Sequence, residues 1–236
     1  MNTVVHTSDS RGFADHGWLR SRHSFSFAGY YNPERVHFGA LRVLNDDQVA
    51  GGQGFGTHPH DNMEIISIPL SGDLEHKDST GRSEVIRQGD VQIMSAGSGL
   101  RHSEYNHNTD KPVEFLQIWV FPKERDITPR YVQKSYSATD RTNKFQTVVA
   151  PEGGEALTIN QDAWFSLGNL EAGTTLNYKF NKSGSGLYAF VLKGEATIAG
   201  EALGSRDAVG VTDTPEVSIT ADSDTEILLM EVPMKF

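Results

Sequence analysis

The 236-residue sequence contains no cysteine, which excludes disulfide-stapled scaffolds, thiolate metal sites and thiol nucleophiles. Basic residues are scarce, because 21 Lys and Arg stand against 31 Asp and Glu, for a formal net charge of −10. We therefore expect no direct binding to nucleic acid or to an anionic membrane, since phosphate-rich partners need a basic surface. The sequence also lacks long apolar runs and the apolar stretch of a signal peptide. These absences predict a soluble, cytoplasmic protein.

Helical periodicity is nearly absent as well, and short apolar or alternating runs recur between turn signals. Such runs lie at residues 38–44, 64–70, 91–94, 113–121, 186–192, 216–220 and 225–232. Strands at this spacing predict an all-β fold of the sandwich or barrel type.

The β pattern is repeated along the chain. The segment LSGDLE at 70–75 resembles LKGEAT at 192–197, and the runs at 113–122 and 225–233 both end in proline. This self-similarity predicts two tandem β domains, at residues 1–122 and 145–236. The polar stretch between them, residues 123–144, is predicted to be a linker or crossover.

Histidine is confined to the first half of the chain, at positions 6, 16, 23, 37, 58, 60, 76, 102 and 107. Two pairs are closely spaced: His58-Pro59-His60 and His102-Ser103-Glu104. Side chains at i and i+2 of a strand project from the same face, so each pair offers two ligands toward one point. Two neighbouring strands of this kind would close a site of three nitrogens and one oxygen.

Such a ligand set suits divalent iron, nickel, manganese, cobalt, copper or zinc. For His-x-His alone, the alternative is a pair of surface or hydrogen-bonded core histidines. A metal is favoured because His-x-Glu lies in a second glycine-framed segment of the same half.

The glycine framing resembles the motifs of the cupin superfamily. Gly52, His58, His60, Glu64 and Gly72 follow the spacing of the first cupin motif, with one extra residue before the last glycine. The second motif is matched loosely by Gly89, Gly99, His102 and Asn106. The run is two residues longer than the motif and lacks the proline that the motif usually carries.

A more specific resemblance covers most of the chain. The segments at 16–33, 54–81 and 93–108, with their THPH and GLRHSEYN runs, resemble the bacterial branch of the pirin family. The resemblance implies a bicupin, with two tandem antiparallel β-barrel or jelly-roll domains of which only the N-terminal one binds metal. It implies one divalent transition metal per chain, with iron the first choice. The implied metal ligands are His58, His60, His102 and Glu104.

Other residues receive more modest roles. We expect Glu64 either to support the ligands without binding the metal or to form a structural ion pair. His23, Phe55 and Tyr105 are candidates for the pocket around the site. His16, His37, His76 and His107 are interpreted as hydrogen-bonded loop or surface residues. The second domain has no histidine opposite any ligand and is expected to be free of metal.

The resemblance implies a metal-dependent dioxygenase of the quercetin 2,3-dioxygenase type, acting on a small, flat, chelating aromatic substrate and dioxygen. The metal would acidify a bound hydroxyl, and Glu104 would accept its proton as the catalytic base. The alternative is a non-enzymatic, metal-dependent regulatory protein that binds a protein partner. A cupin isomerase or a purely structural metal site is a third interpretation. Open coordination positions that face an aromatic-walled cavity would favour the enzyme.

Overall fold

A computed structural model describes the whole chain, Met1–Phe236, as 22 β-strands and two short 3-10 helices, η1 (Ser8–Ser10) and η2 (Ala138–Arg141). The chain divides into two compact units. We call residues 12–37 and 41–136 the N-terminal unit, and residues 1–11, 38–40 and 137–236 the C-terminal unit. The predicted all-β, bicupin fold is confirmed, since each unit pairs a seven-stranded sheet with a four-stranded one.

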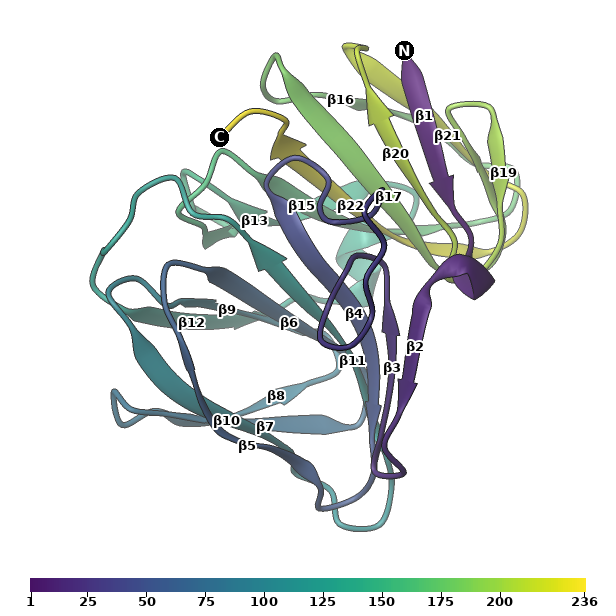
Figure 1. The fold of residues 1–236 in the computed structure, drawn as a ribbon. Coiled ribbons are helices and arrows are strands. Elements are labelled where there is room, and N and C mark those ends of the chain that lie inside the picture. The colour runs from purple at the N-terminus through teal and green to yellow at the C-terminus, as the bar shows by residue number, and fades with distance from the viewer. The chain divides into compact units, whose positions relative to one another are not determined.

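The N-terminal unit holds the histidine-rich segments. Its large sheet has the order β12 (Arg130–Ser135), β9 (Asp90–Ser95), β6 (Glu64–Ser71), β11 (Val113–Val120), β4 (Leu41–Val49), β3 (Leu19–His23), β2 (Gly12–Asp15). Its small sheet has the order β5 (Gly54–His60), β10 (Leu100–Asn106), β7 (Asp73–Asp78), β8 (Ser83–Arg87). All neighbouring strands are antiparallel, and Figure 1 shows β5, β10 and β7 lying across this unit from β6 and β9.

The interior of this barrel is apolar at one end and polar at the other. At one end, side chains from both sheets form an apolar cluster that includes Leu19, Val49, Leu74, Ile86, Val113 and Phe115. Side chains alternate along β3, so that Leu19, Ser21 and His23 face inward and the two arginines between them are exposed. The inward-facing side chains of β3 therefore change from apolar at Leu19 to polar at Ser21 and His23. Each fully buried large apolar side chain contributes about 1.5–3 kcal/mol, so the apolar end anchors the fold and the polar end is available for function.

The C-terminal unit repeats this architecture. Its large sheet has the order β1 (Asn2–His6), β20 (Ala208–Thr212), β17 (Ser185–Lys193), β22 (Thr225–Pro233), β15 (Trp164–Leu170), β13 (Phe145–Ala150), β14 (Leu157–Thr158). Its small sheet has the order β16 (Thr175–Lys179), β21 (Glu216–Ala221), β18 (Ala196–Ile198), β19 (Glu201–Leu203). The inner faces meet in one apolar cluster that includes Leu187, Val209, Val217 and Ile227.

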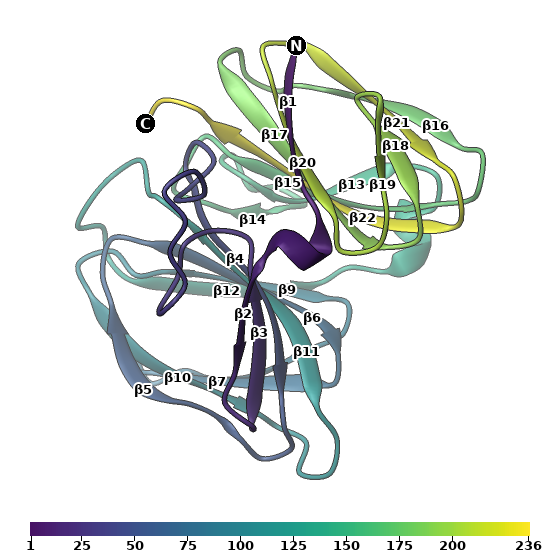
Figure 2. The ribbon, with the colours of Figure 1, turned by 45° about the vertical axis from the view of Figure 1, so that its right-hand side comes forward.

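The unit boundaries depart from the expected ones at two places. Strand β1 pairs with β20 from Asn2↔Thr212 to His6↔Ala208, so the start of the chain completes the C-terminal sheet (Figure 2). The segment expected to be a linker contains β12, which pairs with β9 from Arg130↔Ser95 to Ser135↔Asp90. Both are edge strands with at most one fully buried side chain, so neither has the apolar alternation that predicts a strand from the sequence.

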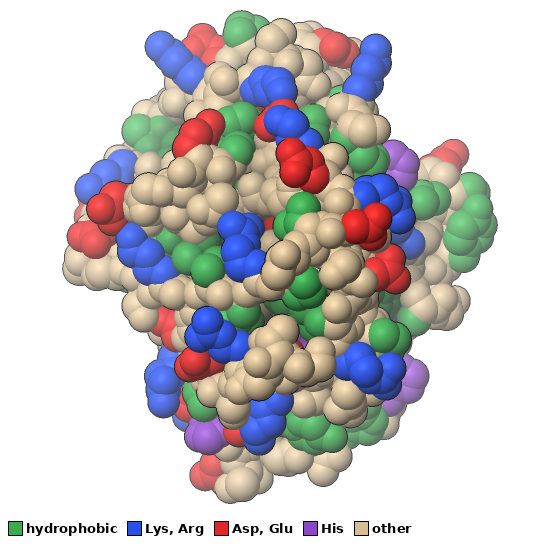
Figure 3. Space-filling view, turned by 90° about the vertical axis from the view of Figure 1, so that its left-hand side faces the viewer, with side chains coloured by type: hydrophobic (Ala, Val, Ile, Leu, Met, Phe, Trp, Pro, Cys, Tyr) green, Lys and Arg blue, Asp and Glu red, His purple; other side chains and the backbone are tan.

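Charged side chains of both signs are interspersed on the face drawn in Figure 3, and hydrophobic groups between them are small. Neither of the short helices has the length or apolar character needed to cross a bilayer.

Candidate metal centre

The two histidine motifs lie on adjacent strands. β5 and β10 are antiparallel, and His58 is the direct partner of His102. The close approach of the strands requires glycine at position 54, because a Cβ there would lie 2.3 Å from the Glu104 carbonyl oxygen. A register shift between His102 and Glu104 places Glu104 opposite Phe55. The strands thus bring the His-x-His and His-x-Glu motifs to the same place.

Three imidazoles meet at this point. The ring centroids of His58 and His102 are 4.5 Å apart, and His60 lies 4.9 Å from each of them. One ring nitrogen from each of the three lies within 4.8 Å of the others. Burial and the neighbouring imidazoles lower the pKa of His60 to about 4 and the pKa of His102 to about 3. These two rings are therefore neutral at physiological pH and hold free lone pairs.

Hydrogen bonds determine which ring nitrogen of His58 and of His102 keeps an available lone pair. The Nδ1 atom of His58 lies 2.8 Å from the Gly56 carbonyl oxygen, so its proton sits there and Nε2 keeps the lone pair. On His102, Nε2 is buried without a hydrogen-bond partner. The other nitrogen of His102, Nδ1, lies 3.4 Å from His76 Nδ1. Both lone pairs needed for a metal are thus available.

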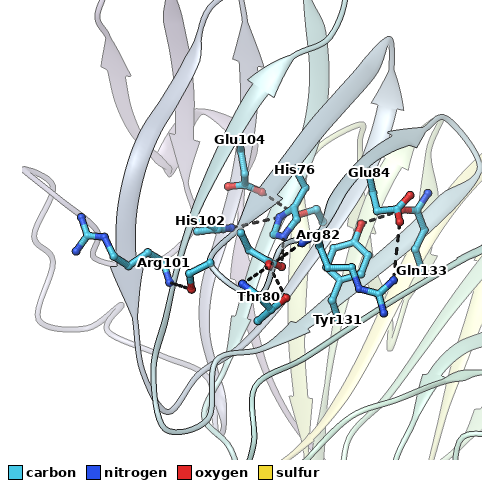
Figure 4. Close-up of polar contacts among 12 residues, drawn as sticks. His76, Thr80, Arg82, Glu84, Arg101, His102, Glu104, Tyr131 and Gln133 are labelled. Atoms are coloured by element: carbon cyan, nitrogen blue, oxygen red, sulfur yellow. Dashed lines mark hydrogen bonds and ion pairs between the residues drawn. The ribbon is translucent and has the colours of Figure 1, made fainter.

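His76 lies beside the three-histidine group. It is fully buried on β7, and its Nε2 atom lies 2.9 Å from the buried Asp78 carboxylate. The carboxylate can only accept, so His76 Nε2 carries the proton and His76 Nδ1 accepts from His102 Nδ1. Figure 4 shows His76 pointing toward His102 and Glu104. The interpretation of His76 as a loop or surface residue is corrected here: it follows the inward-facing Leu74 at i+2 along β7.

Glu104 is buried at the edge of the group. Its Oε1 atom accepts a hydrogen bond from Ser67 Oγ at 3.3 Å, and its Oε2 atom accepts from Gln117 Nε2 at 2.7 Å. A carboxylate oxygen of Glu104 lies within 4.8 Å of ligand nitrogens of His76 and His102, whereas His58 and His60 form their group without it. Ser67 and Gln117 had no signal in the sequence, because neither matches a position of the two motifs and their contact with Glu104 depends on strand pairing.

These donors suit a divalent transition metal. Neutral imidazoles and a carboxylate are the ligand types that such ions prefer, and an unpartnered buried lone pair on His102 is what a ligand atom requires. The donor set is compatible with iron, nickel, manganese, cobalt, copper or zinc, and it does not select one among them.

A cavity of about 760 Å³ opens beside the group, and His58 and Glu104 form part of its wall. Aromatic side chains supply most of the apolar lining: Phe13, Trp18, Phe27, Tyr30, Phe55 and Trp119. Trp119 packs edge-to-face on both His60 and Phe27. Of the three pocket candidates, His23 and Phe55 line this cavity. Tyr105 does not line it, because it follows Glu104 on β10 and therefore points to the opposite face, where it is 39% exposed.

Glu64 lies outside both groups of candidate ligands. It is buried, accepts a hydrogen bond from Ser95 Oγ at 2.8 Å, and lies 3.9 Å from the Arg130 guanidinium. These contacts fit the second of its expected roles, a structural ion pair.

The fold and the site together define a two-domain cupin protein with a candidate metal centre in its N-terminal unit. Comparison with known families gives a match to the Pirin model over residues 4–120 and to the quercetinase C-terminal cupin domain over residues 147–232. The chain therefore belongs to the pirin family, and the predicted resemblance is confirmed.

Individual relatives extend over nearly the whole chain. A quercetin 2,3-dioxygenase of Escherichia coli K12 is 42% identical over 231 residues, 96% of each protein. A pirin-like protein of Caulobacter vibrioides is 41% identical over 225 residues, 94% of this chain and 96% of the relative. The crystal structure of the E. coli pirin YhhW with nickel(II) superposes with a TM-score of 0.93 at 40% identity, covering 98% of this chain and 99% of that one. These relatives support an oxygenase-type enzyme and a divalent metal.

Proposed function

We propose that this protein is a metal-dependent dioxygenase that acts on flavonols such as quercetin, with His58, His60, His102 and Glu104 as the metal ligands. The observation that carries the proposal is the juxtaposition of three clustered imidazoles and a buried carboxylate with an aromatic-walled cavity of about 760 Å³. A flat aromatic molecule fits such walls, and two of the candidate ligands, His58 and Glu104, form part of them. The names of the relatives and the nickel bound to YhhW give independent support.

The chain's own residues have distinct tasks in this proposal. When bound, the metal would supply Lewis acidity that lowers the pKa of a chelated hydroxyl group. Glu104 accepts the hydroxyl proton, and Ser67 and Gln117 orient its two oxygens through their hydrogen bonds. Trp119 and Phe27 shield the reacting ring from water, because they close the apolar wall beside His60.

The test begins with protein purified without chelators, whose metal content is measured. Samples stripped and reloaded with each candidate metal are then incubated with quercetin, and dioxygen uptake is followed together with loss of the flavonol absorbance. We expect stoichiometric consumption of both with at least one metal. Stoichiometric metal binding with no consumption under any metal would overturn the enzymatic proposal and favour the regulatory alternative.

A further inference from the structure

A row of polar side chains crosses the inner face of the large sheet in the N-terminal unit. We call it the polar row, and it consists of Ser67 on β6, Gln117 on β11, Asn45 on β4 and His23 on β3. These residues are direct register partners from strand to strand, Ser67↔Gln117, Gln117↔Asn45 and Asn45↔His23. Direct partners project from the same face of a sheet, so the row is continuous. All four are buried, and three of them, Gln117, Asn45 and His23, line the cavity.

The two ends of the row differ in their hydrogen bonding. At the β6–β11 end, Ser67 Oγ donates its one hydrogen to Glu104 Oε1 or Gln117 Oε1, and Gln117 Nε2 donates to Glu104 Oε2. At the β4–β3 end, Asn45 Oδ1 and His23 Nδ1 are buried without a partner, and so is Oδ1 of Asp47, two residues further along β4. These three side chains are only 3–5% exposed, and all of them line the cavity.

Buried polar atoms without partners are rare, because each one loses its hydrogen bond to water on folding. Asn45 Oδ1 is an acceptor, and so is Asp47 Oδ1 when its carboxyl is ionised, so hydroxyl donors complement this end of the cavity. At the other end, beside His60, Trp119 Nε1 is a buried donor without a partner and calls for an acceptor. The cavity therefore has unpartnered hydrogen-bond acceptors at one end and an unpartnered donor at the other.

The spacing of the strands sets the reach of a bound molecule. The cavity-lining members of the polar row, Gln117, Asn45 and His23, cross two inter-strand gaps of about 4.8 Å each, so they span roughly 10 Å of the cavity wall. A planar molecule of two or three rings covers this span. Trp18, Phe27 and Phe55 line the same cavity and supply the apolar surface for such rings.

We infer that Asn45, Asp47 and His23 form a specificity subsite for hydroxyl groups on the end of the substrate that points from the metal ligands toward β4 and β3. The substrate class is then a flat aromatic that chelates at one end and carries phenolic hydroxyls at the other. An analogue without the distal hydroxyls leaves these buried acceptors unpaired and binds more weakly. The inference rests on the proposed function only for the chelating end of the substrate.

The experiment compares quercetin with galangin, which carries the same chelating groups but no hydroxyl on its phenyl ring. Binding of each flavonol to the nickel-loaded protein is measured by fluorescence quenching under strictly anaerobic conditions, so that no turnover is needed. We expect quercetin to bind at least about tenfold more tightly, as one or two net hydrogen bonds predict. Asn45→Leu, which is nearly isosteric, should reduce this ratio to about one and leave galangin affinity unchanged or improved.

Asp47→Asn is the more conservative second variant and should lower the ratio at least threefold. Asp46→Asn is its matched control, because it makes the same chemical change at the neighbouring position of β4, whose side chain points away from the cavity. Circular dichroism and metal content verify that each variant is folded and loaded.

The inference is overturned if the wild type binds the two flavonols equally, or if folded Asn45→Leu keeps the full ratio. An equal loss of the ratio in Asp46→Asn also overturns it, since the effect would then be a general charge effect. Discrimination without any dioxygen consumption would leave this inference standing and remove the proposed function. Turnover of quercetin together with equal binding of the two flavonols would support the proposed function and overturn this inference.

Discussion

The Nδ1 atoms of His76 and His102 lie 3.4 Å apart in the interior of the N-terminal unit. Because Asp78 holds the proton of His76 on Nε2, the two Nδ1 atoms share the proton that belongs to His102. Asp78, His76 and His102 thus form a chain that ends on the free Nε2 of His102. Such a chain orients a ligand ring and raises its basicity.

We predict that His76→Leu lowers metal affinity about 10–100-fold, because His102 loses the partner that fixes its tautomer. His76→Gln should lower it less, since a glutamine oxygen can still accept from His102 Nδ1. Competition with a chromogenic chelator measures the affinity. His107→Leu serves as the control, because His107 is a half-exposed residue outside the group. Equal affinities for His76→Leu and the wild type would contradict this chain.

His58→Ala and His102→Ala should each abolish stoichiometric metal binding while the barrel remains folded. Each variant removes one of the imidazoles of the group, whereas the apolar cluster under the site contains no histidine. Metal analysis and circular dichroism measure the two outcomes. The wild type should bind one metal per chain, since both candidate groups lie in the N-terminal unit and share His102. A variant that retains a full equivalent of metal would remove its residue from the ligand set.

Glu104→Gln and Glu64→Gln should separate chemistry from stability. Glu104→Gln should weaken metal binding and abolish turnover together, because it removes the proposed ligand charge and base. Glu64→Gln should leave metal content near normal and cost about 1–2 kcal/mol of unfolding free energy, because it removes the carboxylate charge 3.9 Å from the Arg130 guanidinium. Metal analysis, turnover assays and urea unfolding measure these effects. The reverse ranking would place Glu64 among the ligands in place of Glu104.

Asp47 should make stability depend on pH in the metal-free protein. Burial raises the pKa of this carboxyl to about 7, with the charges of Asp46 and Glu104 adding to the effect and a hydrogen bond from Ser21 opposing it. The unfolded chain loses this proton near pH 3.8, so the carboxyl destabilises the fold progressively as pH rises from about 4 to 7, and no further above 7.

Asp47→Asn does not titrate and should therefore be more stable than the wild type at neutral pH. Its advantage should be about 1.4 kcal/mol larger at pH 8 than at pH 6, one pKa unit below the folded value. Urea unfolding at both pH values measures it, and the difference between variant and wild type cancels the other titrating groups. An advantage that is constant with pH would show that Asp47 is ionised in the folded protein throughout this range.

Several features could be predicted from local patterns. Period-two alternation placed His58 with His60, and His102 with Glu104, on common faces, and the structure has both pairs on strands. The same alternation from Leu74 gives the inward direction of His76, so the burial of this residue also has a local signal. Local alternation and turn residues are likewise enough to predict the all-β class, because the alternation of a strand can be recognised within five to nine consecutive residues.

The long-range pairings required the tertiary structure. Nothing in NTVVH at the start of the chain specifies that β1 pairs with β20 more than 200 residues later. Gln117 and Asn45 meet only because β11 and β4 are paired in one register, and a shift by one residue would turn both away from the cavity. The three unpartnered atoms near β3 and β4 are also a property of the fold, since burial exists only after packing.

The sequence by itself determined the all-β class, the family and the two histidine motifs, because these depend on residues that are neighbours along the chain. Only the tertiary structure decided that His76 and Asp78 support His102, and that a polar row borders the cavity. The physical reason is that register and burial are set by the simultaneous packing of many strands. No single segment contains that information.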